Sequence, residues 1–404
     1  MDTNSILEWL KSSLSSSEKR ASRRILRFLR PEDDKIFLKA LQAERPRHRP
    51  LREVKRLGII RAYSCPLPPQ GMPLPFGAGL VWEEDPLISM HAAPLRPSGS
   101  AFKRTADSAP RSPRRSSKPT RVRSITDQGI PWGVRRIRAP EAWSRTTGHR
   151  VKVGVIDTGV DFSHPDLSHS LERGINLIQR TMPPHDDNGH GTHIAGTIAA
   201  ANRLQGMIGV APRASIYPIK AFDYNGTAFV SDIILGIDWC VRNRMDVVNM
   251  SFGMENRSKS LLAAVSNAYR SGVLIVASSG NDGKRGQIDY PARYRQTVAV
   301  GAINRLGKVA SFSNRCDAVD IYAPGEKILS SWPRGGRKFM SGTSMATSHV
   351  TGAVALLLGL KPELTPEQIK AILKRSTRPL RSGKSRGAGE LDVTRMLLAA
   401  KQMP

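Results

Sequence analysis

The sequence has 404 residues, of which 39% are hydrophobic, so it can bury the core of one large domain and a smaller one. The formal net charge of +28 raises nucleic acid or another polyanion as a partner. The three cysteines, Cys65, Cys240 and Cys316, are odd in number and widely spaced, which argues against a disulfide framework. No apolar run reaches the length of a membrane-spanning helix.

Residues 1–91 are predicted to form a small α+β unit. Helical patterns run over 5–29, 34–43 and 51–57, and strand patterns over 58–65 and 79–86. The basic N-terminus contains no uninterrupted apolar stretch of the length that a signal peptide needs. We therefore favour a cytoplasmic location, with secretion as the alternative.

Residues 92–125 have a different composition. They carry nine Lys or Arg residues against one acid, Asp107, and are rich in Pro and Ser. Such a segment cannot bury enough apolar surface to fold, so it is predicted to be a solvated linker that proteases can reach. Its charge also makes it a candidate site for binding nucleic acid or another polyanion.

Residues 126–404 alternate between strand and helix patterns. The strands are predicted at 151–156, 216–221, 246–251, 273–278, 298–303 and 319–322. The helices are predicted at 191–201, 230–242 and 258–271, and from Thr343 and Pro366 onward. Runs such as 273–276 lack polar alternation, which is typical of strands covered on both faces. We expect a three-layer, doubly wound α/β domain with a mostly parallel sheet, whose functional residues gather at the carboxyl ends of the strands.

Four polar residues deserve separate consideration. Asp157 ends the first strand, His190 opens a helix of small residues, Asn281 follows a buried strand, and Ser344 falls in the first turn of a helix. A hydroxyl at a helix start faces unpaired N–H groups and the positive end of the helix dipole, which suits a nucleophile and its oxyanion. Taken singly, each of these residues is more typical of an ordinary cap, turn or surface position.

Together and in this order, the motifs resemble those of the subtilisin-like serine proteases, the subtilase or peptidase S8 family. They are Asp157-Thr-Gly, His190-Gly-Thr-His, Ser279-Gly-Asn281 and Gly342-Thr-Ser344-Met-Ala. The resemblance covers about residues 128–400 and implies the subtilisin-like fold and a serine endopeptidase that acts on protein or peptide substrates. It implies no cofactor for the chemistry, and we expect a monomer.

The resemblance also assigns roles. Ser344 would attack the peptide carbonyl to form an acyl-enzyme, His190 would act as general base and then acid, and Asp157 would orient His190. Asn281 and the Ser344 N–H would bind the oxyanion.

The resemblance further assigns two walls of a substrate pocket. One matches a strand that pairs with an extended peptide, and the other matches the far side of the primary specificity pocket. The residues are Ser251, Phe252 and Gly253 on the first wall and Ser278, Ser279 and Gly280 on the second. Small residues predict an open pocket for large apolar or mixed side chains, and no acid that would select basic residues is evident.

The stretch 79–92 resembles the last strand and tail of the family's inhibitory propeptide, although a Pro-rich segment at 66–75 replaces the helix expected before it. We therefore expect residues 1–91 to be the pro-region of a zymogen, which occupies the cleft as an intramolecular inhibitor. Autocleavage is expected between Met90 and the end of the linker.

Calcium is a further expectation from the resemblance. Gln128 and Asp166 match two ligands of the family's calcium site, but Arg203 stands where the family usually supplies an asparagine. A cation in place of an oxygen ligand disfavours Ca²⁺, so a structural calcium ion stays an open prediction.

Two alternative functions also stay open. One is a processing protease with a narrow set of targets. The other is a polyanion-binding protein that uses the basic linker on an inactive protease fold.

Overall fold

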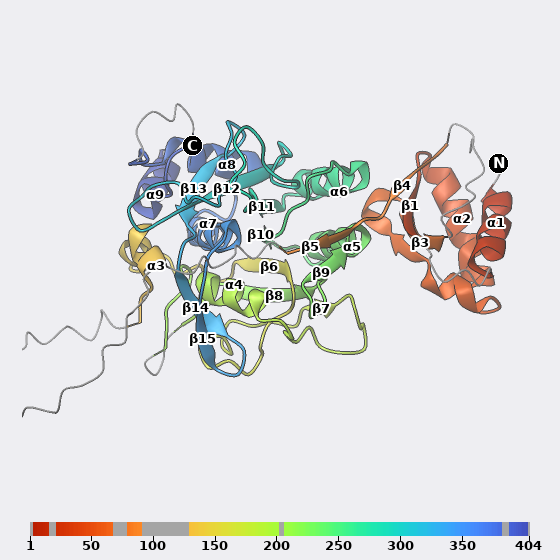
Figure 1. The fold of residues 1–404 in the computed structure, drawn as a ribbon, viewed down its shortest axis with the longest axis horizontal. Helices are drawn as coiled ribbons and strands as arrows, with labels where there is room; N and C mark the ends of the chain where they lie inside the picture. The colour runs from red at the N-terminus through yellow and green to blue at the C-terminus, as the bar shows by residue number, and fades with distance from the viewer. Residues whose placement is uncertain are drawn as a thin grey trace, which may run out of the picture.

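The computed structural model describes residues 3–15, 22–67, 79–90, 129–201, 206–381 and 388–402. Figure 1 shows a large α/β domain, formed by the described residues from 129 onward, beside a smaller N-terminal unit, formed by those up to Met90. The predicted linker at 92–125 lies outside the described residues, as do Gln128 and Arg203. In the part of the chain that is described, no helix combines the length and apolar character needed to cross a membrane.

The large domain is built on a seven-stranded sheet in which all neighbouring strands are parallel. Its strands are β6 (Lys152–Asp157), β7 (Ile175–Asn176), β8 (Ser215–Lys220), β10 (Val247–Met250), β11 (Leu274–Ser278), β12 (Thr297–Ile303) and β13 (Ile321–Pro324). The spatial order is β13-β12-β11-β10-β6-β8-β7. Successive strands therefore lie on both sides of β6, and ligands of such sheets bind beyond the carboxyl ends of the strands at this switch point.

Helices cover both faces of the sheet. They are α3 (Trp132–Arg136), α4 (His190–Ala199), α5 (Val230–Arg242), α6 (Lys259–Arg270), α7 (Thr343–Leu358), α8 (Pro366–Arg375) and α9 (Val393–Lys401). Val153 and Val155 of β6 share a buried cluster with α4 and α7, whereas Ile156 shares a second cluster with α5 and α6. Because neighbouring strand residues point to opposite faces, the sheet lies between two helical layers. The predicted three-layer α/β architecture is confirmed.

Short strands outside the main sheet were not predicted. β9 (Thr227–Phe229) lies just before α5, and β14 (Ile328–Trp332) and β15 (Gly336–Met340) form an antiparallel hairpin before α7. Their patterns are too short to be distinguished from loops by periodicity.

The N-terminal unit is a small α+β structure, as expected. Its elements are α1 (Thr3–Ser15), β1 (Ser22–Phe28), α2 (Pro31–Glu44), β2 (Lys55–Leu57), β3 (Ala62–Leu67) and β4 (Leu80–Glu84), with short 3₁₀ turns at Arg49–Glu53 and Gly58–Ile60. The strands form an antiparallel sheet in the order β2-β3-β1-β4. Its core includes Leu10, Leu26, Phe37 and Tyr63.

Two helix predictions in this unit were wrong. The first helix ends at Ser15, and part of the predicted 5–29 helix forms the central strand β1. Residues 51–57 form the end of a 3₁₀ turn and β2 instead of a helix. In β1, Leu26 is buried among the unit's own helices, while Ile25 is buried in the cluster that contains α5 and α6. Because β1 is covered on both faces, its apolar residues are adjacent and do not alternate.

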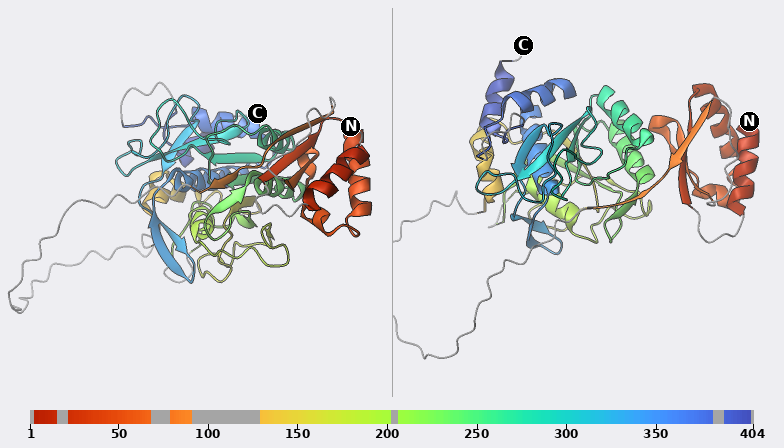
Figure 2. Two further views of the ribbon diagram at one scale, coloured as in Figure 1. Left: turned by 45° about the vertical axis from the view of Figure 1, so that its right-hand side comes forward. Right: turned by 45° about the horizontal axis from the view of Figure 1, so that its top comes forward.

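The N-terminal unit packs against the layer formed by α5 and α6, and Figures 1 and 2 show it beside these helices from three directions. Ile25, Leu57 and Ile60 join the large domain's second buried cluster. At the edge of this contact, the Lys55 ammonium lies 2.7 Å from a carboxylate oxygen of Asp232. The two parts thus share an apolar contact and an ion pair.

After β4 the chain crosses to the large domain and adds a strand there. β5 (Leu87–Ser89) pairs antiparallel with β9, with Ile88 opposite Ala228. The next residue, Met90, donates its N–H to the Gly226 carbonyl over 2.8 Å.

Candidate active site

Asp157 and His190 form a direct pair at the carboxyl end of β6. The His190 Nδ1 atom lies 2.9 Å from Oδ1 and 3.0 Å from Oδ2 of Asp157. Asp157 is the last residue of β6 and His190 the first residue of α4. The Asp157 carboxylate also accepts the Thr158 N–H over 2.8 Å. Both side chains are buried, so water screens their interaction little.

The surroundings of His190 change its affinity for a proton. Burial by itself lowers the pKa of the imidazole, but the charge and hydrogen bond of Asp157, together with the charge of Asp186, outweigh burial. The net effect raises the pKa of His190 above its ordinary value of 6.5. His193, one turn further on, differs: burial lowers its pKa to about 3. Its Nε2 lies 3.1 Å from the Ile328 carbonyl oxygen, which ties α4 to the β14–β15 hairpin.

Asp186 fixes the loop from which His190 projects, and sequence reasoning missed it. Its Oδ1 accepts the Gly189 N–H over 2.8 Å, and its Oδ2 accepts the Thr192 N–H over 2.9 Å. Oδ1 also accepts the Thr158 hydroxyl over 2.8 Å, which joins this loop to the end of β6. Asp186 thus accepts an N–H of the first turn of α4 from outside the helix, whose N-cap residue is Gly189. Its place four residues before His190, in the run Asp186-Asp-Asn-Gly-His190, was the available signal.

Ser344 lies in the first turn of α7, as predicted. Its hydroxyl donates to the Ser251 carbonyl oxygen over 2.9 Å, and the Ser251 hydroxyl donates to the Ser344 carbonyl oxygen over 3.3 Å. Ser251 directly follows β10, whose Met250 is in register with Ile156 beside Asp157. The sheet register therefore brings Ser344 to the same edge as the Asp157–His190 pair. In this structure the Ser344 hydroxyl is bonded to Ser251 and not to His190.

Asn281 is attached to the same helix start. Its Oδ1 accepts both the N–H and the hydroxyl of Thr343, over 2.8 and 2.9 Å. This fixes the orientation of the carboxamide. A Cβ atom added to Gly342 would lie 3.3 Å from Asn281 Nδ2, so the amide nitrogen faces the turn that leads into Ser344.

The two predicted walls of the substrate pocket follow neighbouring strands. Ser251–Gly253 follow β10, and Ser278–Gly280 end and follow β11, which pairs with β10. The Ser278 hydroxyl donates to the Phe252 carbonyl oxygen over 3.3 Å and so joins the walls. No acid was evident near these walls from the sequence, but the structure places one beside them. The Asp289 carboxylate borders both Gly253 and Gly280.

The N-terminal unit contacts this domain through two further acids. Glu83 accepts the N–H groups of Lys259 and Ser260 at the start of α6, over 3.0 and 2.9 Å. Asp85 accepts the Ser231 N–H at the start of α5 over 2.8 Å. Burial raises the pKa of Asp85, and hydrogen bonds from Ser231 and Ser64 act against this rise. These two acids thus cap helices of another part of the chain.

The two residues assigned to calcium have different outcomes. Gln128 lies outside the described residues. The Asp166 carboxylate accepts the Met207 N–H over 3.3 Å and lies 3.5 Å from Arg337 Nε. In the described part of the chain, no group of three or more His, Cys, Asp or Glu residues could hold a metal ion. The described residues by themselves do not fit a calcium site, since a guanidinium contacts the one matching carboxylate.

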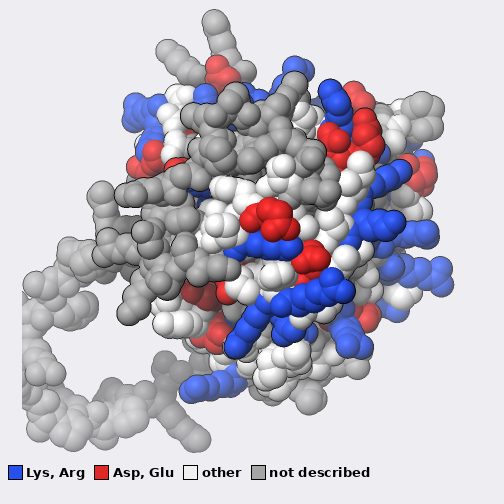
Figure 3. All heavy atoms as spheres, turned by 90° about the vertical axis from the view of Figure 1, so that its right-hand side faces the viewer, with Lys and Arg blue, Asp and Glu red and all other residues white. Residues whose placement is uncertain are grey.

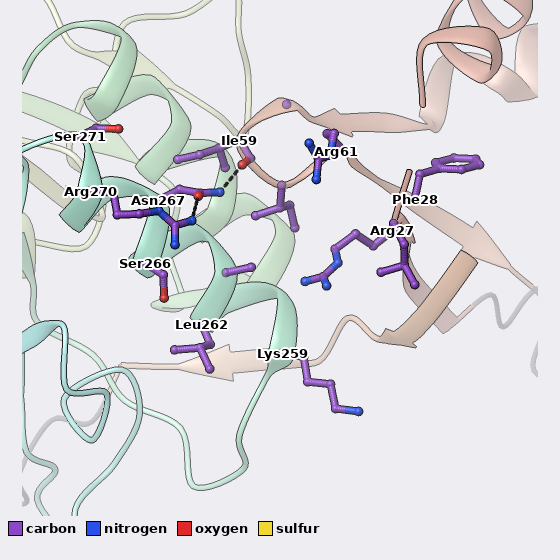
Figure 4. A pocket seen from close by; sticks show the side chains of 14 residues that line it. Arg27, Phe28, Ile59, Arg61, Lys259, Leu262, Ser266, Asn267, Arg270 and Ser271 are labelled. Carbon is purple, nitrogen blue, oxygen red and sulfur yellow. Dashed lines mark hydrogen bonds between the residues drawn. The ribbon is translucent and has the colours of Figure 1, made fainter. Parts of the chain in front are cut away.

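A basic cavity of about 940 Å³ lies between the N-terminal unit and α6 (Figure 4). Arg27 and Arg61 border it from the N-terminal unit, and Lys259 and Arg270 from α6, with no acid among its described lining residues. On the face viewed from the N-terminal unit, Lys and Arg side chains gather along the right and lower parts (Figure 3). Because these four side chains are positively charged, the cavity is a candidate site for the predicted polyanion binding.

Comparison with known proteins identifies the family of this chain. The model of the subtilase family, Peptidase_S8, matches residues 148–392. The chain is 43% identical over 271 residues to subtilisin E of Bacillus subtilis (strain 168), covering 66% of this chain and 71% of that protein. It is 42% identical to subtilisin of Bacillus pumilus, covering 66% and 98%, and 43% identical to subtilisin Savinase of Lederbergia lenta, covering 65% and 96%. The chain therefore belongs to the subtilase family and is a serine-type endopeptidase.

Proposed function

We propose that Asp157, His190 and Ser344 are the catalytic triad of this endopeptidase. One observation carries the proposal: His190 Nδ1 lies within 3.0 Å of both Asp157 oxygens, at the sheet edge where Ser251 holds Ser344. With Nδ1–H donated to Asp157, Nε2 is the basic atom of the imidazole. Asp157 thus selects the tautomer and stabilises the imidazolium that forms.

The Ser344 hydroxyl has one proton, which it donates to the Ser251 carbonyl. It must exchange that bond for one to His190 Nε2 as the substrate binds, since catalytic hydrogen bonds often tighten only in the enzyme–substrate complex. His190 then accepts the proton while Ser344 Oγ forms a bond to the peptide carbonyl carbon. The same proton passes to the departing amine, and water releases the acyl group in the reverse sequence of transfers.

Two donors would stabilise the negative charge on the carbonyl oxygen. They are the Ser344 N–H at the start of α7 and the Asn281 Nδ2 group, whose orientation follows from the Thr343 bonds to Oδ1. A donor that is already oriented needs no reorganisation when charge develops, and one such donor contributes roughly a hundredfold or more to the rate.

Casein hydrolysis by the purified protein tests the triad. Activity should be present in the wild type, lost in Ser344→Ala and blocked by a serine-directed fluorophosphonate. Thr347→Ala is a suitable control because Thr347 lies on the same helix and its hydroxyl donates to the Thr343 carbonyl of that helix over 2.8 Å. Undiminished hydrolysis by Ser344→Ala would refute the proposed nucleophile.

We also propose that the N-terminal unit is a pro-region that keeps the enzyme inactive until it is cut off. Support comes from the pairing of β5 with β9 and from Met90, which lies beside Gly226. A Cβ atom at Gly226 would lie within 4 Å of both Met90 and Asn188, and Asn188 belongs to the loop that precedes His190. The strand therefore runs toward the catalytic centre, as a bound peptide would.

Autoprocessing is tested by incubating the full-length protein with and without Ser344→Ala. Wild type should be cut after Met90, somewhere before the end of the basic linker, while the variant stays intact. The cut site is read by N-terminal sequencing of the product. Intact protein in both samples would overturn the zymogen proposal without affecting the triad.

Polyanion binding is a second proposal, carried by the basic cavity of Figure 4 and by the linker composition. If the cavity binds polyanions, the protein should stay bound to an anionic resin after the linker is removed. The double variant Arg27→Ala/Arg61→Ala should bind the resin less.

The expected monomer is tested on the same samples by light scattering. Calcium binding stays a prediction, which calcium titration tests. A narrow choice of substrates also stays a prediction, which cleavage of a peptide library tests.

A further inference from the structure

Asp289 is a buried carboxylate that the proposed chemistry does not use. Its N–H donates to the Ser279 carbonyl oxygen over 3.0 Å, so its backbone is fixed to the second wall of the substrate pocket. Its side chain is fully buried. A buried acid usually has a specific structural or functional reason, because removing a charge from water is costly.

The Asp289 carboxylate lies where both walls lack side chains. A Cβ atom added to Gly253 would lie 2.8 Å from Asp289 Oδ2, and one added to Gly280 would lie 2.4 Å from the same oxygen. Gly280 has φ of +101°, a backbone conformation that favours glycine. Gly253 has no such φ, but a Cβ atom there would lie only 2.7 Å from the Cβ atom of Asp289. The Asp289 side chain therefore lies between the two glycines, with Oδ2 against both.

The other carboxylate oxygen is held in place. Asn314 Nδ2 donates to Asp289 Oδ1 over 3.3 Å. Asn314 is itself fixed, since its N–H donates to the Gly280 carbonyl and its Oδ1 accepts the Lys284 N–H over 2.9 Å. The bond from Asn314 thus fixes the orientation of the carboxylate, whose Oδ2 lies against the two glycines of the predicted pocket walls.

We propose that Asp289 is the floor of the primary specificity pocket and selects substrates with Lys or Arg before the scissile bond. The inference rests on the proposed function, because it assigns a substrate class to the same catalytic centre. A cationic side chain that enters between Gly253 and Gly280 gains an ion pair with Oδ2 where water is excluded. An apolar side chain of equal length gains no such ion pair.

This assignment replaces the apolar pocket predicted from the small wall residues. It also makes the chain's own linker a suitable substrate, because residues 92–125 contain nine Lys or Arg residues. The sequence could not show the link, since Asp289 lies in a separate loop from Gly253 and only the fold brings them together.

The test is the kcat/KM of the autoprocessed protein for a series of fluorogenic peptides that differ only in the residue before the cleaved bond. Lys and its uncharged analogue norleucine are the decisive pair, with Arg, Phe and Leu beside them. Active-site titration with a fluorophosphonate gives the concentration of working enzyme. Lys and Arg should exceed norleucine, Phe and Leu by at least tenfold.

Asp289→Asn should lower kcat/KM for Lys and Arg by at least tenfold and leave or raise the value for norleucine and Phe. Asp246→Asn is the matched control. Asp246 precedes β10 at the opposite edge of the sheet, and its carboxylate also accepts a backbone N–H, that of Lys152. The Asp246→Asn variant should keep the substrate preference of the wild type.

Three outcomes would overturn the inference. Wild type could cleave norleucine or Phe as well as Lys, or Asp289→Asn could reduce all substrates equally, as a purely structural acid would. Asp289→Asn could also keep the full preference for Lys. The wild-type comparison decides the question even where the variant fails to fold. Absence of both fluorophosphonate labelling and cleavage would instead contradict the proposed function.

Discussion

The large domain presents two pairs of helix N-termini on opposite faces of its sheet, and the two pairs have different partners. On one face, the starts of α4 and α7 carry His190 and Ser344 and are held by Asp186 and Asn281 from the same domain. On the other face, the starts of α5 and α6 receive Asp85 and Glu83 from the N-terminal unit. Unpaired N–H groups and the helix dipole attract oxygen atoms in both cases.

The residues that hold the helix starts differ in which part of the chain they come from, and this difference determines what they can do. Partners within the domain stay in place and can position reacting groups for every turnover. Under the proposal that the N-terminal unit is a pro-region, Asp85 and Glu83 leave with that unit, so they control only whether the domain is covered. Changes on the α4–α7 face should therefore alter the chemistry, whereas changes on the α5–α6 face should alter the release of the N-terminal unit.

The largest effect is expected for Asp157→Asn. The carboxamide cannot stabilise an imidazolium and can hold His190 in the wrong tautomer, so kcat should fall by roughly ten-thousandfold. KM should change little, because Asp157 lies behind the imidazole and away from the pocket walls. Steady-state kinetics on a peptide substrate measures both, and a loss below tenfold would remove Asp157 from the mechanism.

Asp186→Ala should have a smaller effect on the same face. It removes the hydrogen bonds to the start of α4 and to Thr158, which costs about 1–2 kcal/mol of stability and loosens the position of His190. We expect kcat/KM to fall by about ten- to a hundredfold, because small misplacements of catalytic groups are costly. Thermal unfolding and kinetics should be measured together. A lower Tm with unchanged kcat/KM would show that Asp186 supports only the fold.

Glu83→Gln and Asp85→Asn should act on the other face. Each replaces a charged cap by a neutral one and should weaken the hold of the N-terminal unit by about tenfold, or about 1.4 kcal/mol. The delay between cleavage, followed on gels, and the appearance of peptidase activity should shorten. Glu84→Gln is the control, because Glu84 lies between the two on β4 and is exposed. An equal effect of all three variants would contradict specific capping.

The smallest effect is a shift in the pH profile. His190 must be neutral to accept a proton, and the Asp157 charge raises its pKa above 6.5. Activity should therefore rise with pH through a midpoint above 6.5 and be lost as the pH falls below it. The pH dependence of kcat/KM reports this value for the free enzyme. A midpoint below 6.5 would mean that burial outweighs Asp157.

Much of the catalytic face could be predicted from the sequence. The parallel strands are buried on both sides, so their apolar runs are continuous and easily recognised. Asp157, His190, Asn281 and Ser344 lie in local motifs whose small neighbours indicate turns and helix starts. The local patterns indicated where these residues lie in the fold, whereas their proposed roles came from the resemblance of the whole set to the family.

The rest could not be predicted because it depends on distant contacts. Residues 22–28 form a strand only because α1 and α2 cover one face and the large domain covers the other. The capping roles of Glu83 and Asp85 require the N-terminal unit to lie against α5 and α6. Asp289 lies beside Gly253 and Gly280 because β10 pairs with β11 and Asn314 holds its carboxylate, which its own sequence neighbours do not reveal.

The most direct test of the central claim is to locate the fluorophosphonate adduct by peptide mass mapping of the wild type and of Asp157→Asn. We predict one stoichiometric adduct on Ser344 in the wild type, formed much more slowly in Asp157→Asn because His190 loses its orienting partner. An adduct on another residue, or equal labelling rates in the two proteins, would contradict the proposed triad.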